Sequence, residues 1–210
     1  MDFQTALGCY LTPEQLASIG GLAVGIAGAG GLGSNCAAHL VRSGFRNLHL
    51  VDFDCVEPSN LNRQFFFADQ IGRPKVAALA ENLRRITPDL SLALAQARIT
   101  EDNAADWFAD CDVVVECVDV PAVKAWLIEA YVPAGKLVVA ASGIAGCDLR
   151  PLPVRQIGKL VLVGDEQSGI DKSPPLAPRV AAAAALQANA VLHFALRQAA
   201  QKSGGRPQKN

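Results

Sequence analysis

Short apolar runs alternate with longer segments of helical spacing along most of the chain. Apolar runs bounded by turn residues are typical of buried strands, whereas apolar side chains every three or four positions are typical of helices. The runs predict strands over residues 22–28, 48–51, 91–97, 113–115 and 137–141. The longer segments predict helices over residues 34–41, 75–87, 101–109, 121–131 and 180–196.

Strands that alternate with helices in this way form a mostly parallel sheet with helices on both faces, so the predicted fold is α/β and Rossmann-like. The rhythm changes after Gly143, where two short runs, 154–157 and 160–163, are separated by a Gly-Lys pair. This pattern predicts a hairpin that adds an antiparallel extension at the C-terminal side of the sheet. Residues 164–178 are rich in glycine, serine and proline and predict a loop.

The length of 210 residues predicts one domain, over residues 1–202, followed by a polar and flexible tail over residues 203–210. Half of the residues are hydrophobic and 19% are charged, which argues against disorder. A net charge of −1 provides no general field for nucleic acid or for an anionic membrane, so neither partner is expected. Residues 1–4 lack the features of a secretory signal, and we expect a cytoplasmic protein.

Cysteines and histidines give little sign of chemistry. The six cysteines are scattered without a C-x-x-C pair, so no zinc site and no disulfide framework are expected. The three histidines lie within apolar periodic segments and are interpreted as core or surface residues. The apolar segment 180–196 is shorter than the roughly 20 residues that span a bilayer, and it predicts a buried helix.

Gly28, Gly30 and Gly33 form a G-x-G-x-x-G motif between the first predicted strand and its helix. Such glycines let the backbone approach a phosphate, and the helix N-terminus directs N–H groups at it. Asp52 ends the next predicted strand, about 20 residues beyond Gly33, where a carboxylate accepts hydrogen bonds from ribose hydroxyls. These features predict nucleotide binding and suit NAD as well as ATP.

Three further motifs decide between these nucleotides: Asp52-Phe53-Asp54, Asn60-Leu61-Asn62-Arg63-Gln64 and Gly72-Arg73-Pro74-Lys75-Val76. Together with the glycine motif they resemble the adenylating family that contains ubiquitin-activating enzymes, the molybdopterin-synthase activator MoeB and the thiamine-biosynthesis protein ThiF. The similarity spans nearly the whole chain. Segments that resemble the short, bacterial second family of ThiF are residues 142–146, 164–166, 177–179 and 187–189.

The resemblance implies an enzyme that binds ATP and Mg²⁺ and adenylates a carboxylate. Arg63 and Lys75 match basic positions that hold the triphosphate, and they would neutralise charge on the departing pyrophosphate. Asp119 matches the acidic position that supports magnesium, and these three residues are the catalytic candidates. Glu116 is a second acidic candidate. The expected nucleotide contacts come from Gly28, Gly30, Gly31, Gly33, Asp52, Asp54, Asn60, Arg63, Gln64 and Lys75.

The substrate implied by the resemblance is the C-terminal glycine of a ubiquitin-like sulfur carrier ending in Gly-Gly. A ThiS-like carrier in thiamine thiazole biosynthesis is the first choice, and a MoaD-like carrier in molybdopterin synthesis is the alternative. The resemblance also implies a homodimer. The arginine that MoeB-like proteins carry near the N-terminus has no counterpart, since no arginine precedes Arg42, and no cysteine is identified for a covalent link to the carrier. A nicotinamide-dependent oxidoreductase and a non-catalytic nucleotide-binding module stay open as other classes of function.

Overall fold

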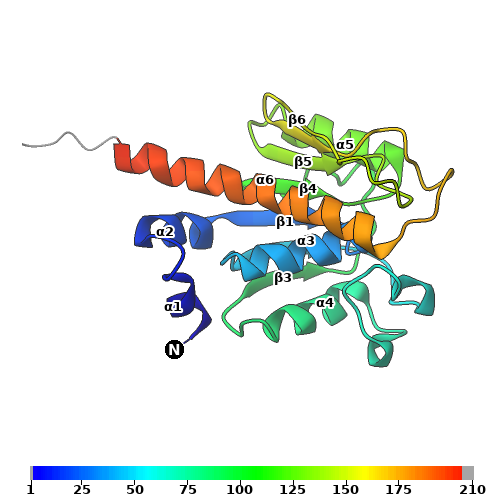
Figure 1. Ribbon diagram of the computed structural model, residues 1–210, viewed down its shortest axis with the longest axis horizontal. Coiled ribbons are helices and arrows are strands. Elements are labelled where there is room, and N and C mark those ends of the chain that lie inside the picture. The colour runs from blue at the N-terminus through cyan, green and yellow to red at the C-terminus, as the bar shows by residue number, and fades with distance from the viewer. Residues whose placement is uncertain (1, 205–210) are drawn as a thin grey trace, which may run out of the picture.

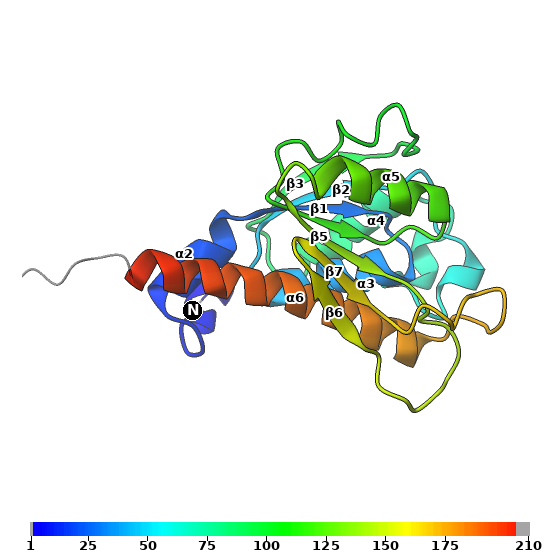
Figure 2. The same ribbon diagram turned by 90° about the horizontal axis from the view of Figure 1, so that it is seen from above.

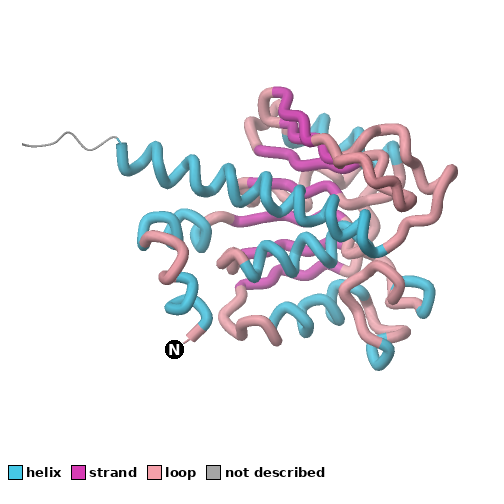
Figure 3. The backbone as a smooth tube through the Cα atoms, in the orientation of Figure 1, coloured by secondary structure: helices cyan, strands magenta, loops and turns pink. Residues whose placement is uncertain are grey.

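The computed structural model describes residues 2–204, which form a seven-stranded sheet with helices on both faces (Figures 1 and 3). The strand order is β3-β2-β1-β4-β5-β7-β6, and all neighbours are parallel except β6 and β7. The strands are β1 Ala23–Ala27, β2 Asn47–Val51, β3 Ser91–Ala95, β4 Val113–Glu116, β5 Leu137–Ala141, β6 Val154–Ile157 and β7 Leu160–Val163. The predicted α/β class and its antiparallel C-terminal pair are confirmed.

The described residues also form six α-helices and two short 3₁₀ helices, with α1 and α2 before the first strand and α6 after the last. The α-helices are α1 Phe3–Leu7, α2 Pro13–Gly21, α3 Gly31–Arg42, α4 Lys75–Arg84, α5 Pro121–Tyr131 and α6 Ala177–Gly204. The 3₁₀ helices are η1 Pro58–Asn60 and η2 Ala68–Gln70. Figure 2 shows α5 on one side of the sheet and both α3 and α6 on the other.

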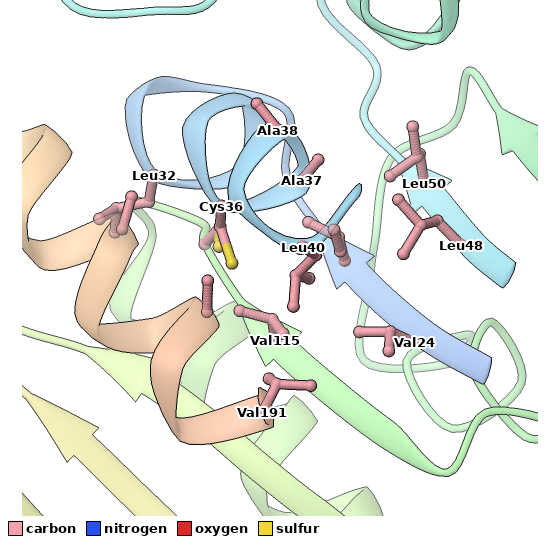
Figure 4. Close-up of a cluster of buried hydrophobic side chains, with 14 of the residues drawn as sticks. Val24, Leu32, Cys36, Ala37, Ala38, Leu40, Leu48, Leu50, Val115 and Val191 are labelled. Carbon is pink, nitrogen blue, oxygen red and sulfur yellow. The ribbon is translucent and has the colours of Figure 1, made fainter. Parts of the chain in front are cut away.

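Each face of the sheet has its own hydrophobic core. On one face, side chains of α3, α4 and α6 pack with inward-facing residues of the central strands. Figure 4 shows Cys36 and Leu40 of α3 beside Val115 of β4 and Val191 of α6. On the other face, α5 packs with the segment that contains Phe108. Coverage on both faces explains why β1, β4 and β5 consist almost entirely of apolar residues.

Several boundaries differ from the prediction. Residues 101–110 form successive turns and not the predicted helix, although one of them, Phe108, is fully buried. The sequence prediction also omitted α1 and α2, which precede the first strand. Helix α6 includes residues 203 and 204 of the predicted flexible tail, and residues 205–210 lie outside the described part of the chain.

Helix α6 is long and apolar enough to cross a membrane by length and composition alone, over Ala177–Gln201. It packs against α3 and β5, however, and Ala183, Ala184, Val191 and Ala195 are fully buried in the core. These contacts account for its apolar composition as that of a core helix.

The carboxyl ends of the parallel strands meet at one edge of the sheet, since β1, β2, β3, β4, β5 and β7 all run in the same direction. The chain leaves β1 toward α3 on one face and leaves β4 toward α5 on the other. Loops from the two neighbouring strands therefore diverge, and a crevice opens between them at the point where ligands bind in folds of this kind.

Candidate functional site

A cavity of about 640 Å³ opens at the carboxyl ends of the strands. Its wall includes the β1–α3 turn, the segments after β2, β3, β4 and β5, and part of the loop before α6. The sequence-predicted residues that line it are Gly28, Gly30, Gly31, Asp52, Asp54, Asn60, Arg63, Gln64, Lys75 and Asp119. Residues as far apart in the sequence as Gly28 and Asp119 thus meet in one cavity.

The glycine turn between β1 and α3 forms the centre of the wall. Gly28 has a φ of 94°, a conformation that favours glycine, and a Cβ atom there would lie 2.8 Å from the carbonyl oxygen of Cys117. Helix α3 begins at Gly31 without a side-chain cap. Its first N–H groups therefore have no side-chain acceptor and supply donors for an anion at the helix N-terminus.

Gly33 packs against the glycine turn without lining the cavity. A methyl group there would collide with the carbonyl oxygen of Gly28. The third glycine of the motif therefore allows α3 to pack closely against β1. The structure shows this packing contact, and the contact of Gly33 with the nucleotide stays a prediction.

Asp52 ties the end of β2 to the glycine turn. Its Oδ2 accepts a 2.6 Å hydrogen bond from the backbone N–H of Ala29, and its Oδ1 accepts a 2.8 Å bond from that of Asp54. Burial raises the pKa of Asp52, although both N–H donors oppose the shift. Each carboxylate oxygen retains a further lone pair, and Asp52 lines the cavity, which suits acceptance from ligand hydroxyls.

The segment after η1 folds around Asn60, whose Oδ1 accepts the N–H of Glu57 and whose carbonyl oxygen accepts the N–H groups of Arg63 and Gln64. This turn brings both following side chains to the cavity. Arg63 donates to Ser59 O and Asn62 Oδ1, and no carboxylate of the described residues pairs with it. Its positive charge is therefore available to an anionic ligand.

Gln64 is 8% exposed, and its Oε1 is buried with no hydrogen-bond partner in the described structure. An unpaired buried acceptor is uncommon because its desolvation is not offset. The side chain lines the cavity beside Gly30, where a donor group on a ligand would satisfy it.

Lys75 is the first residue of α4, which follows η2, and it lies against Asp54. Its backbone N–H donates to Asp54 O at 2.9 Å, and its Nζ donates to Asp54 Oδ2 at 2.8 Å. Lys75 is 6% exposed, so this pairing fixes a buried ammonium group at the cavity wall. Asp54 therefore positions Lys75 and offsets its charge.

Asp119 follows β4 as an exposed carboxylate that lines the cavity, with no hydrogen bond or ion pair to other described residues. Glu116, three residues earlier, is fully buried and does not line the cavity. Both of its carboxylate oxygens accept hydrogen bonds from Lys124, at 2.8 and 2.7 Å, and Lys124 also donates to Ala141 O. Glu116 is thus a structural ion-pair partner and not a second acidic ligand at the cavity.

Metal ligands do not cluster within residues 2–204, where no group of three or more His, Cys, Asp and Glu side chains is arranged to hold an ion. One carboxylate, that of Asp119, is enough for a Mg²⁺ ion that takes most of its ligands from phosphate and water. The six cysteines are all unpaired, and Cys36, Cys111 and Cys117 are buried.

The motifs and this geometry agree with a comparison against protein families. The model described as "ThiF family" matches residues 4–208. The chain belongs to the ThiF family. The resemblance inferred from the sequence motifs is therefore confirmed at the level of the family.

Curated relatives of this ThiF-family chain include fungal proteins named "Adenylyltransferase and sulfurtransferase uba4". The protein of Emericella nidulans is 38% identical over 120 residues, covering 57% of this chain and 25% of the relative. The protein of Candida glabrata is 35% identical over 120 residues, covering 57% and 28%. The chain thus matches about a quarter of the length of these relatives.

Solved structures show the same fold over most of the chain. The E. coli tRNA N6-threonylcarbamoyladenosine dehydratase TcdA superposes with a TM-score of 0.82 at 21% identity, covering 97% of this chain and 96% of that chain. E. coli MccB superposes with a TM-score of 0.69 at 23% identity, covering 88% and 58%. At these identities the likeness shows the fold alone.

Two parts of the ThiF-family cavity escaped the sequence interpretation. At one end, the guanidinium of Arg98 lies 3.6 Å from the centre of the Phe53 ring, and both residues line the cavity. At the other end, residues 142–144 after β5 and residues 168–171 complete the wall. The position of Arg98 just beyond a parallel strand is a sequence signal for the Arg98–Phe53 end. The wall formed by residues 142–144 and 168–171 has no such signal, because it depends on how a long loop folds back.

Proposed function

We propose that this chain is an ATP-dependent adenylyltransferase that activates the C-terminal carboxylate of a ubiquitin-like sulfur carrier. The carboxylate would attack the α-phosphate of ATP and form an acyl-adenylate, while the bond between the α- and β-phosphates breaks and pyrophosphate leaves. The observation that carries the proposal is one cavity that combines the glycine turn, Asp52, the unpaired Arg63 and the buried Lys75. Membership of the ThiF family supports it.

The strand order supports a proposed place for each part of ATP. The base would lie at the end of β3 near Arg98, the ribose beside Asp52 at the end of β2, and the phosphates over the β1–α3 turn. The solved structures of E. coli TcdA include complexes with ATP and with AMP, and those of E. coli MccB include one with ATP. These complexes of proteins with the same fold support a nucleotide in this cavity.

Positive charge near the phosphates would favour departure of pyrophosphate. Arg63 and Lys75 are fixed before the ligand arrives, so little reorganisation is needed as charge moves to the leaving group. Asp119 would hold Mg²⁺ together with phosphate oxygens, and the bound ion would add charge neutralisation there. No residue needs to form a covalent intermediate for this reaction, because orientation and charge stabilisation suffice.

The finer choice of carrier is a ThiS-like protein that serves thiamine thiazole biosynthesis. It is supported by the segments that resemble the second family of ThiF, because residues 142–144 of these segments line the β5 end of the cavity. A MoaD-like carrier is the alternative. A homodimer and a cytoplasmic location are further proposals that rest on the sequence and the resemblance.

The carrier is tested by intact-mass spectrometry. The chain is incubated with ATP, Mg²⁺ and either a ThiS-like or a MoaD-like carrier that ends in Gly-Gly, and each carrier is then weighed. We expect one added adenylyl group on the ThiS-like carrier and its absence from a carrier without the final glycine. An adduct on the MoaD-like carrier alone would overturn the finer choice, and no adduct on any carrier, with tight NAD binding, would overturn the adenylyltransferase.

A further inference from the structure

Arg179 is a buried arginine in the first turn of α6, only 7% exposed and outside the set of residues that line the cavity. Its Nη1 donates to the carbonyl oxygens of Asp148 and Arg150, at 2.8 and 3.3 Å. Its Nη2 donates to Asp165 Oδ2 at 3.1 Å. A buried guanidinium is costly unless it is paired, and these partners come from two loops that are separate in the sequence.

Asp165 is the centre of the second loop. Its Oδ1 accepts the N–H groups of Gln167 and Ser168, at 2.9 and 2.7 Å, and its Oδ2 accepts the Ser168 hydroxyl at 2.6 Å. The Ser168 hydrogen bonds, together with the nearby Arg179, hold the pKa of Asp165 well below its ordinary value. The carboxylate is therefore ionised and ties Ser168 to Arg179.

The loops joined by Arg179 run directly into the cavity wall. Gly143 has a φ of 72°, and a methyl group there would collide with the Asp165 carboxylate. The N–H of Glu166 donates to Ser142 O at 3.1 Å, and the N–H of Ala145 donates to Ser168 O at 2.9 Å. Residues 142–144 and 168–171, which line the cavity, are thus connected through one hydrogen-bonded unit that Arg179 anchors to α6.

This unit forms only one end of the cavity. The glycine turn, Asp52 and Arg98 follow β1, β2 and β3, whereas residues 142–144 follow β5 on the other side of β4. Under the proposed function, ATP occupies the β1–β3 side. The β5–β7 side is the part of the wall left for the second substrate.

We propose that Arg179 is a positioning residue that acts through Asp165 to fix the β5–β7 wall of the cavity for the carboxylate substrate. The inference rests on the proposed function for the identity of that substrate. Its distinguishing consequence is selective: loss of Arg179 impairs use of the carboxylate carrier and leaves nucleotide affinity unchanged.

The test compares Arg179→Gln and Arg179→Lys with Arg150→Gln as a matched control. The Arg150 side chain is 73% exposed in a surface ion pair with Asp148, and it reaches no cavity residue. Three quantities are measured for each variant. Calorimetry gives the affinity for ATP, and steady-state kinetics of adenylation give kcat/KM for the full carrier. Amide hydrogen exchange is followed across the chain. The exchange measurement needs no carrier and therefore stands apart from the proposed function.

For Arg179→Gln we expect kcat/KM for the carrier to fall by about 100-fold, since small misplacements of a substrate carry losses of that order. The Kd of ATP should stay within about twofold, Arg179→Lys should recover part of the loss, and exchange should accelerate in residues 142–150 and 164–171. Equal losses toward ATP and the carrier, or unchanged exchange in these segments, would overturn the role of Arg179. A parent protein that adenylates no carrier would overturn the proposed function and the substrate assigned to this wall. Faster exchange confined to these two segments in Arg179→Gln would still support Arg179 as their anchor.

Discussion

Arg63 and Lys75 bring two positive charges to the same cavity in different states of pairing. Arg63 has no carboxylate partner among the described residues, whereas Lys75 is held 2.8 Å from Asp54. A ligand phosphate can therefore use the whole charge of Arg63, but it must share Lys75 with Asp54. Both charges are fixed by local folding, Arg63 through the Asn60 turn and Lys75 through the start of α4.

We expect Arg63→Ala and Lys75→Ala each to lower the rate of adenylate formation by about 100- to 1,000-fold, because each removes a preorganised charge that stabilises the transition state. Single-turnover kinetics at saturating ATP measure the loss. Arg73→Ala is the matched control, since Arg73 pairs with Glu81 and does not line the cavity. Parent rates in both cavity variants would remove these residues from the chemistry.

The raised pKa of Asp52 predicts how nucleotide affinity depends on pH. Burial raises its pKa, so the carboxyl group takes up a proton at a higher pH than an ordinary aspartate. The charged form accepts hydrogen bonds from Ala29, Asp54 and the proposed ribose, and protonation removes acceptor capacity. As pH falls through this raised pKa, affinity for adenosine nucleotides should therefore fall.

Calorimetric titrations with AMP across the acidic range measure this dependence, and Asp52→Asn provides the comparison because it cannot ionise. The variant should bind more weakly near neutral pH, and it should lack the part of the acidic decline due to Asp52. The same linkage lowers stability as pH rises from the ordinary carboxyl pKa through the raised one, since the folded state holds the proton more tightly. An identical pH profile in parent and variant would show that Asp52 does not govern affinity.

Residue types and spacing predicted that polar side chains from separate motifs would meet at one cavity. Asp52, Arg63 and Lys75 occur in motifs whose chemistry is local, and the structure brings all three to one wall. Gly33 and Glu116 were candidates on the same kind of evidence, yet Gly33 packs behind the turn and Glu116 is buried against Lys124. Spacing alone does not tell whether a side chain faces a cavity or the core behind it.

At the scale of elements, the Glu116–Lys124 pair connects β4, α5 and β5. Lys124→Met would leave the fully buried Glu116 carboxylate without its counter-ion, and losses of about 3 kcal/mol are typical when a buried pair is broken. We expect that decrease in the free energy of unfolding, measured with urea. The double variant Glu116→Gln with Lys124→Met should recover at least half of it, because no unpaired charge remains.

A decrease below about 0.5 kcal/mol in Lys124→Met would contradict a structural role for the pair, since surface ion pairs have effects of that size. Lys136→Met is a suitable control, because Lys136 also contacts carbonyl oxygens, Ala109 O and Cys111 O, but has no carboxylate partner among the described residues.

Helix signals explain which elements the sequence could predict. Helix α2 has a capping box, in which Thr12 and Gln15 satisfy each other's backbone N–H groups, with Pro13 at its first position. That local signal is present in the sequence. Residues 101–110 instead follow apolar spacing without adopting a helix, because burial of Phe108 against Tyr131 sets their path. That contact joins residues distant in the chain and has no local signature.

At the scale of the whole molecule, alternation of strands and helices predicted a parallel sheet, and the order β3-β2-β1-β4 follows once crossovers keep one handedness. The crevice beside β1 and β4 then follows from the fold class. The β5–β7 wall does not, because residues 164–175 return to the cavity through contacts such as Arg179 with Asp165. No periodic pattern in the sequence encodes that return.

A ligand that binds only the folded molecule stabilises all of it. ATP with Mg²⁺ at 100 times its Kd should stabilise the chain by about 2.7 kcal/mol, which corresponds to a rise in Tm of roughly 5–10 °C for a chain of this size. Thermal scans with ATP, NAD and no ligand measure the shift, and Arg63→Ala should reduce the response to ATP. A larger shift with NAD than with ATP would favour the oxidoreductase class.

Carrier-dependent ATP–pyrophosphate exchange tests the central claim most directly, because exchange requires reversible formation of an adenylate from ATP and a carboxylate. The account predicts that labelled pyrophosphate enters ATP only when Mg²⁺ and a carrier with a free C-terminal glycine are both present. Amidation of that glycine should abolish the signal. Full exchange with the amidated carrier, or no exchange with any carrier while the chain binds ATP, would contradict it.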